Sequence, residues 1–320
     1  LTVATSVAAS YINLRALDRQ LDISRATAKN FAGTREIFEL RFKGGVVSQV
    51  EMSQVESQYQ QALAAIPALE QQIAAQENLL SLLLGRNPGP IPRGRAIDQL
   101  VAPDIPGDLP SSLLERRPDI LQAEQTLVAA NANIGVAKSL YYPSLSLTGV
   151  LGSVSTAFSD FLSGSAAAWS VTGGLTGPLF TFGAIEGQVQ TAEAFQREAL
   201  ASYRQVVINA LRETNDALVG TLKKREESEA QSRRVAALRE YARMSWLKFN
   251  NGYAGFLEVL YAENELFSAE LAAVRTQAER YTQLVNVYKA MGGGWVDQAD
   301  TLSMSSAAGT GLTEPAAAQD

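Results

Sequence analysis

One short segment occurs twice in this chain, at an offset of 207 residues, and it constrains the fold more than any other feature. The first copy runs from Leu40 to Ser48 and the second from Leu247 to Gly255. In each copy a basic residue stands four positions before a glycine, between long proline-poor stretches of helical pattern. Such a repeat indicates a duplicated architecture. We therefore expect two helical hairpins of one design, in an elongated unit and not in two compact domains.

The composition excludes several classes of function. The 320 residues include no histidine and no cysteine, so the commonest general base, the commonest metal ligand and every thiol nucleophile are missing. We expect neither an enzyme nor a bound metal or other cofactor. The net charge of −6, with scattered lysines and arginines, gives no reason to expect nucleic acid as a partner. No apolar run approaches the roughly 18 residues of a transmembrane helix.

The helical pattern predicts where the two hairpins lie. Residues 1–85 are expected to form the first, with helices over 1 to about 43 and 48 to about 85, and with a kink at Pro67. In the second, residues 183–295, no proline interrupts the first 68 positions. That stretch predicts a helix of about 100 Å at 1.5 Å per residue. A return helix over residues 255–291 follows, and the tail 296–320 is expected to be disordered.

Between the hairpins the pattern changes twice. Residues 86–110 contain six prolines and predict an extended linker. Residues 111–140 predict two helices, a short one to Arg117 and a longer one whose first position is Pro118, with Asp119 near its positive end. We interpret Arg116, Arg117 and Asp119 as structural residues, although an anion-binding or catalytic role is the alternative.

Residues 141–182 have the alternation of a β-hairpin. Apolar positions such as Leu145 and Leu147 alternate with small polar ones, and two strands of about ten residues have the length of membrane β-strands. Aromatic residues near the strand ends could form a membrane-interface girdle: Tyr141, Tyr142, Trp169, Phe180 and Phe182. The alternative is an ordinary half-buried hairpin. However, a single hairpin leaves its edges unpaired, so its partners must come from other subunits or from a preceding segment.

The repeat also predicts what precedes Leu1. The chain begins without methionine and inside a helical pattern. By the offset of the repeat, another β-hairpin is expected roughly 25 residues upstream of Leu1, in a missing amino-terminal part.

The order of these elements resembles a known family, the TolC-like outer-membrane factors of Gram-negative tripartite efflux pumps, in the OprM-like or NodT-type branch. The resemblance covers essentially residues 1 to 295. It rests on four strings taken together and in order: Glu115-Arg116-Arg117-Pro118-Asp119-Ile120, Tyr142-Pro143-Ser144-Leu145, Leu179-Phe180 and Tyr288-Lys289-Ala290-Met291-Gly292-Gly293-Gly294-Trp295.

The resemblance implies a mainly α fold with a membrane β-hairpin. Long helical hairpins would form a periplasmic tunnel, and a homotrimer would assemble a 12-stranded β-barrel in the outer membrane, in contact with its lipid. The implied function is passive conduction of drugs or other solutes from a periplasmic adaptor and an inner-membrane pump to the exterior. The missing front would carry a lipid-modified cysteine. A type I secretion outlet of the same fold and a soluble coiled-coil scaffold are the alternatives.

The two repeated turns resemble the periplasmic tips of the family, where the channel meets a hexameric adaptor. The two glycines would permit a tight helix reversal, the cations would lie at negative helix ends, and apolar residues would form the apex. The expected docking residues are Arg41, Gly45, Val46, Val47, Ser48, Lys248, Gly252, Tyr253 and Ala254. The alternative is that glycine and a nearby cation are ordinary at helix ends, but their recurrence favours docking. Tyr253 departs from the small aliphatic residue that the family suggests.

A gate is expected just inside the second tip. Glu258, Tyr261 and Glu265 are spaced three and four residues apart, so they share one helix face. In a threefold assembly each would become a ring, and carboxylate rings in a narrow pore favour cations and make closure sensitive to salt and pH. The family often has aspartate where Tyr261 stands, so this tyrosine would seal by bulk or hydrogen bonding. A solvated helix face is the alternative. Glu51 and Glu56 occupy equivalent places in the first copy.

Overall fold

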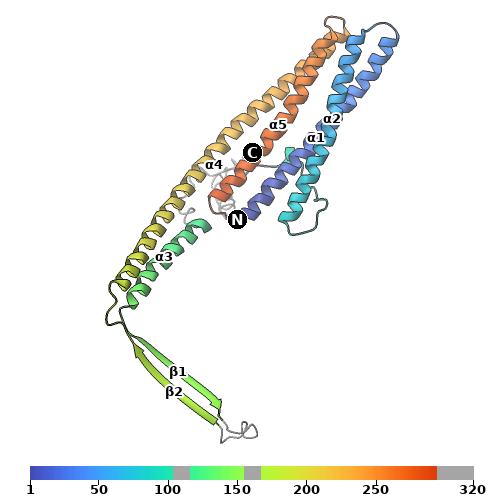
Figure 1. Cartoon of the computed structure of the whole chain (residues 1–320). Coiled ribbons are helices and arrows are strands. Elements are labelled where there is room, and N and C mark those ends of the chain that lie inside the picture. Colours follow the sequence, from blue (N-terminus) through green and yellow to red (C-terminus); the bar gives the residue numbers. More distant parts are fainter. Residues whose placement is uncertain (104–115, 155–166, 294–320) are drawn as a thin grey trace, which may run out of the picture. The chain divides into compact units, whose positions relative to one another are not determined.

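The chain is mainly helical, with one β-hairpin (Figure 1). The computed structural model describes residues 1–103, 116–154 and 167–293. The short helix expected before Pro118, the glycine- and serine-rich loop between the strands and the tail after residue 293 lie wholly or mostly outside these ranges. The elements are α1 (Thr2–Lys43), α2 (Gln49–Leu83), the 3-10 turn η1 (Ile97–Gln99), α3 (Pro118–Ser139), β1 (Ser144–Ser153), β2 (Ala167–Thr176), α4 (Ala184–Asn250) and α5 (Phe256–Ala290).

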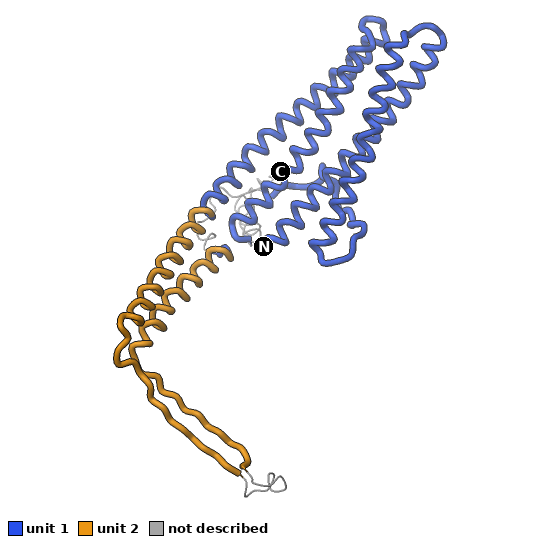
Figure 2. The backbone as a smooth tube through the Cα atoms, viewed as in Figure 1, with its two compact units in different colours: residues 1–117, 210–320 blue, residues 118–209 orange. Residues whose placement is uncertain are grey.

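These elements form two compact units (Figure 2). One unit comprises residues 1–117 and 210–320, and the other comprises residues 118–209. The first contains α1, α2, α5 and the later part of α4. The second contains α3, the two strands and the beginning of α4.

The helix ends confirm the duplication. The offset of 207 residues carries the last residue of α1, Lys43, onto the last residue of α4, Asn250. It also carries Leu83 at the end of α2 onto Ala290 at the end of α5, and both of these helices are 35 residues long. Helix α2 continues through Pro67. The two copies therefore share helix lengths and turn positions, as the repeat predicts.

The first unit has its core where α1 packs against both α2 and α5. Near the turns, buried residues of all three helices form one cluster that includes Phe38, Val55 and Phe256. Further along, Ala16 and Ile23 of α1 pack with Phe267 and Val274 of α5. Because two amphipathic helical hairpins bury their apolar faces against each other, α1 and α5 are the central pair of this unit.

Part of the proline-rich linker is fastened across these helices. We call residues 91–100 the strap. Ile97 is fully buried and packs among apolar residues of α1 and α5, while Ile91 packs against Leu14 and Leu80 of the first hairpin. Of the expected linker, residues 86–103 are described, and they contain no α-helix or strand and only the short turn η1, which agrees with their proline content. The sequence did not predict that it would bind three helices.

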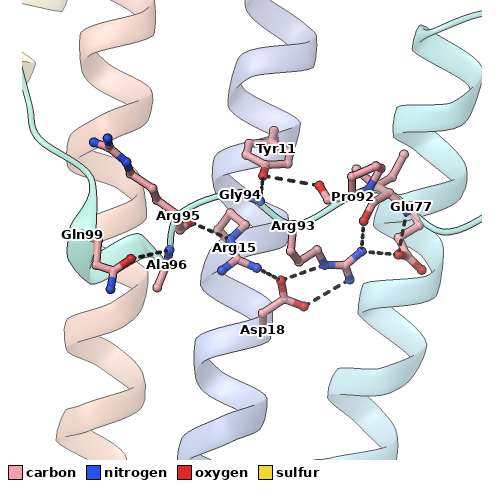
Figure 3. Close-up of polar contacts among 11 residues, drawn as sticks. Tyr11, Arg15, Asp18, Glu77, Pro92, Arg93, Gly94, Arg95, Ala96 and Gln99 are labelled. Atoms are coloured by element: carbon pink, nitrogen blue, oxygen red, sulfur yellow. Dashed lines mark hydrogen bonds and ion pairs between the residues drawn. The ribbon is translucent and has the colours of Figure 1, made fainter.

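Polar contacts hold the strap in place (Figure 3). The guanidinium of Arg93 forms ion pairs with Asp18 of α1, over 3.0 Å, and with Glu77 of α2. Arg15 donates from Nε to the carbonyl oxygen of Arg95 over 3.0 Å. The backbone N–H of Gly94 donates to the hydroxyl of Tyr11 over 2.7 Å. On the α5 side, Gln277 and Tyr281 donate to the carbonyl oxygens of Ile97 and Leu100. The strap therefore joins the first hairpin to the return helix of the second.

The charges around Arg93 stabilise one another. Burial opposes the ionisation of Glu77, but the hydrogen bonds from Arg93 and from the backbone N–H of Ile91 outweigh burial and lower the pKa of Glu77 below its ordinary value of 4.5. The pKa of Arg93 is raised, chiefly by its hydrogen bond to Asp18. Because the folded-state pKa of Glu77 is lowered, its stabilisation is present above the unfolded-state pKa and is lost as the pH falls through the lowered value.

The strap generates a stability prediction. In a full-length protein that carries this chain, Arg93→Ala should reduce the free energy of unfolding by about 1–3 kcal/mol, because the partly buried Glu77 loses its cation and Asp18 keeps only Arg15. The matched control is Arg25→Ala, which breaks an exposed pair with Glu70 and should cost less than about 1 kcal/mol. Urea denaturation of the detergent-solubilised protein measures both values. Equal losses in the two variants would contradict a special role for the strap.

Candidate functional site

The two repeated turns have the same backbone hydrogen bonds. In the first, the N–H of Val46 donates to the carbonyl oxygen of Arg41 over 2.9 Å, and in the second the N–H of Tyr253 donates to that of Lys248, also over 2.9 Å. Gly45 has φ +72° and Gly252 has φ +77°, a left-handed conformation that glycine adopts without strain. Each glycine thus ends its helix in a Schellman motif, as expected for a tight helix reversal.

The two turns differ in how the next helix begins. Ser48 and Glu51 form a capping box, in which the backbone N–H of Ser48 donates to the Glu51 carboxylate over 2.7 Å and the N–H of Glu51 donates to Ser48 Oγ over 3.2 Å. At the equivalent position, Gly255 precedes α5 with no side-chain cap. The start of α2 is therefore capped by a side chain, and the start of α5 is not.

The apex of each turn exposes one apolar side chain. Val46 is 75% exposed and Tyr253 is 85% exposed. Val47 and Ala254, the next residues, are half-buried, and Val47 packs on the core beneath the turn. Among the apolar docking residues expected at the two turns, Val46 and Tyr253 are thus the exposed ones.

An aromatic cluster joins the two turns. Phe38 of α1 lies against Phe256 of α5, with ring centroids 4.1 Å apart, and stacks on Phe249 of α4 at 6.1 Å. Trp246 of α4 contacts Phe249 and Phe256 edge-on at 6.1 Å. Arg41 lies over the rings of Phe38 and Phe249, with its guanidinium carbon 5.9 and 5.6 Å from their centroids. One docking residue of the first turn therefore covers a cluster built mostly by the second hairpin.

The three expected gate residues lie on α5, with different surroundings. Glu258 forms an ion pair of 3.2 Å with Lys248, and Glu265 forms one of 3.1 Å with Arg234. Tyr261, between them, is 61% exposed. The two carboxylates are therefore charge-compensated within the hairpin. Of the three residues, Tyr261 is the one whose side chain is exposed without an ion-pair partner.

Further ion pairs along both hairpins have the same arrangement, with the cation on the first helix of the hairpin and the carboxylate on the second. In the second, cations of α4 face carboxylates of α5, as in the Arg239–Glu270 pair of 2.6 Å and the Lys224–Glu279 pair of 2.7 Å. In the first, Arg35 of α1 faces Glu56 of α2 over 2.8 Å. Sequence reasoning noted Glu56 but missed these partners, because pairs between helices depend on the register of packing and not on spacing along the chain.

In the second unit, the strands pair in the register that the alternation predicts. The apolar positions meet across the strands, with Leu145 opposite Leu175 and Leu151 opposite Trp169, while Thr148 lies opposite Thr172 on the other face. Each strand has ten residues, about 33 Å when extended. Tilted, that length matches an apolar band of about 25 Å.

The predicted interface aromatics are exposed at both ends of this hairpin. Trp169 lies near the end that leads to the connecting loop. The others lie toward the end that leads to the helices: Tyr141, Tyr142, Phe180 and Phe182. Phe182 is fully exposed and has φ +48°, an uncommon conformation for a residue with a side chain. Exposed aromatic residues at both ends are the pattern of a membrane-interface girdle.

Arg117 ties the first unit together. Its buried guanidinium donates to the carbonyl oxygen of Ala290 at the end of α5 over 3.0 Å and pairs with Glu213 of α4 over 2.8 Å. Asp119 accepts from the N–H of Ile120 over 3.0 Å at the start of α3. These contacts agree with the structural interpretation of the two residues.

Over residues 1–103, 116–154 and 167–293, no helix is long and apolar enough to span a membrane. The same ranges contain no group of three or more acidic side chains placed to hold a metal ion.

Comparisons with known proteins agree with this architecture. The family described as outer membrane efflux protein matches residues 1–86 and 109–293. The chain is 30% identical over 295 residues to the cation efflux system protein CusC of Escherichia coli, covering 92% of this chain and 64% of that protein. It is 30% identical over 299 residues to the probable efflux pump outer membrane protein TtgC of Pseudomonas putida, covering 93% of this chain and 62% of that protein.

Solved structures have the same fold. A crystal structure of CusC aligns with a TM-score of 0.81 at 29% identity, covering 92% of this chain and 68% of that one. The open state of the MtrE outer membrane channel of Neisseria gonorrhoeae aligns with a TM-score of 0.79 at 29% identity, covering 92% and 66%.

The chain belongs to the outer membrane efflux protein family. The family resemblance, the mainly α fold with a β-hairpin and the localisation in the Gram-negative outer membrane are therefore confirmed. The relatives are channel proteins and not enzymes, as the composition suggested. The chain spans about 64% of the length of the curated relative CusC.

Proposed function

We propose that this chain is part of an outer-membrane exit duct that conducts solutes passively out of the cell. The observation that carries the proposal is the β-hairpin. Its apolar residues meet on one face in two ten-residue strands, an arrangement that would be costly in water and favourable in lipid. A soluble scaffold would expose this apolar face to water, which is unfavourable. Efflux is favoured over secretion because the matched relatives are named as efflux proteins.

The duct would be a homotrimer. In the described part of the chain, the two strands pair only with each other, and a sheet in lipid requires closed pairing. Strands from other copies, and from the part of the relatives that this chain does not span, would close a 12-stranded barrel. The helical hairpins would form the periplasmic tunnel.

Conductance tests the duct directly. A full-length protein carrying this chain, reconstituted in planar lipid bilayers, should give discrete single-channel steps, because a closed barrel encloses a water-filled path. Its mass in detergent should be that of a trimer. The proposal fails if the protein inserts as a trimer and no conductance appears at any voltage.

We further propose that the repeated turns dock a periplasmic adaptor, which in turn binds an inner-membrane pump. Two observations support docking: the same cap geometry occurs in both turns, and each exposes one apolar apex residue, Val46 or Tyr253. Exposed apolar side chains on an ordered turn are suited to a protein contact. Six such turns in a trimer would match a hexameric adaptor.

Site-directed crosslinking tests the docking turns. Because the described chain has no native cysteine, Val46→Cys provides a unique label at the apex. A thiol-directed crosslinker should capture the adaptor from Val46→Cys in cells. The matched control is Leu82→Cys, an equally exposed position at the far end of α2. Capture from the control position alone would refute the tip assignment.

The gate would lie on α5, with Tyr261 as its constriction. The support is the difference in environment: Glu258 and Glu265 are each paired with a cation of α4, whereas Tyr261 is exposed. Rings of paired carboxylates carry little net charge, so the exposed tyrosines would close the pore by bulk, and the ion pairs would hold α5 in position.

Neutralising either charge of one pair tests this gate. Glu258→Gln leaves Lys248 unpaired and should shift permeability toward anions by about two- to fivefold, equivalent to about 0.4–1 kcal/mol. Lys248→Gln should shift it toward cations by a similar factor. Glu279→Gln, which removes one of the two carboxylate partners of Lys224 far from the turn, is the control. Reversal potentials under a salt gradient measure the shifts, and unchanged values in both variants would remove Glu258 from the pore.

A further inference from the structure

We infer that Phe38 is a positioning residue for the gate. Its ring comes from the first hairpin, inserts into the second, and holds the start of α5 in its observed position, which we take as the closed one. The inference rests on the proposed function, because it concerns the gate of the same channel.

The contacts of Phe38 place it at the junction of the two hairpins. Phe38 is 1% exposed, and its closest ring neighbour is Phe256, the first residue of α5. Phe256 is two residues before Glu258 and five before Tyr261. Any displacement of the gate end of α5 away from α1 must therefore separate the Phe38 and Phe256 rings, which lie 4.1 Å apart.

The start of α5 depends on this ring, because no side chain caps it. Gly255 gives α5 no side-chain cap, whereas Ser48 and Glu51 cap α2. At the start of α5 the aromatic contacts take the place of the capping box. The Lys248–Glu258 pair, which is partly exposed, adds little by comparison.

We call the contact between the Phe38 and Phe256 rings the lock. The two copies of the repeat differ here, because the lock occurs only once. The residue equivalent to Phe38 in the second copy is Ser245, which is buried and whose hydroxyl has no hydrogen-bond partner in the structure. Phe42, the equivalent of Phe249, is partly exposed, whereas Phe249 packs into the cluster. One ring per protomer thus crosses from the first hairpin to the second, and none crosses in the other direction at these positions.

Arg41 is placed to control this lock. It covers Phe38 and Phe249 through cation–π contacts, and it forms no ion pair with any carboxylate of the described residues. A guanidinium held only by aromatic faces is available to an acidic group of a docking partner. Withdrawal of Arg41 would uncover the rings and weaken the hold on α5. Docking at the first turn would thereby be coupled to the gate on the second hairpin.

The test compares two phenylalanines of the same core. In the full-length protein in planar bilayers, Phe38→Leu should raise the ratio of open to closed time by about fivefold, since a looser lock shifts the population toward the open state. The control is Phe267→Leu, a buried residue in the middle of α5. It should lose similar stability, measured by urea denaturation, and leave the open time within about twofold of wild type.

Two further variants keep the test decisive if Phe38→Leu does not assemble. Arg41→Gln leaves the core intact and should raise the open time in the same direction by about twofold, the size of an exposed cation–π contact. A protein with Phe38→Cys and Phe256→Cys, bridged by a short cleavable thiol crosslinker, should stay closed until the bridge is cleaved.

The outcomes separate the two proposals. If wild type forms trimers without conductance, the duct itself is refuted. Suppose instead that wild type conducts and that Phe38→Leu or Arg41→Gln has the same ratio of open to closed time as wild type. If the bridged protein also opens as freely as the unbridged one, the role of Phe38 is refuted and the duct stands. An equal rise in open time in Phe267→Leu would also refute the lock, because it would show general loosening.

Discussion

The packing of α5 against α1 is the contact on which the first unit depends. Each helix belongs to a different copy of the repeat, and their contact buries apolar residues of one hairpin against those of the other. The contact is fastened at two levels: by the aromatic cluster around Phe38 beside the turns, and by the strap further along, where Arg93 and Ile97 bind. The first level is apolar and the second is mainly polar, so the two respond differently to salt and acid.

Much of this architecture follows from local pattern. Helix ends were predictable because left-handed glycines such as Gly45 and Gly252 mark them, and strand register was predictable because a period of two fixes which faces meet. The strap contacts and the insertion of Phe38 were not predictable. Arg93 meets Asp18 and Glu77 across 75 and 16 positions of sequence, and no local spacing encodes which helices a linker crosses. The roles of Glu258 and Tyr261 stay predictions.

The β-hairpin sets a different requirement. Its apolar face is exposed along both strands, and its backbone edges have no further partner among the described strands. Both features make an isolated hairpin unfavourable in water. The hairpin is complete only in lipid and beside strands of other origin. These features are the ones expected of a component of the proposed assembly, and they agree with the membership of the chain in an outer-membrane family.

The capping difference between the two turns has a consequence for the order of folding. The first turn carries all of its own fastening within a few residues of Ser48, so α1 and α2 can pair early through contacts of short sequence separation. The start of α5 has no such local support and requires Phe38, a residue 218 positions earlier than Phe256. We therefore expect the first hairpin to serve as the template on which the start of α5 is ordered, so that the two halves of the duplication fold in succession.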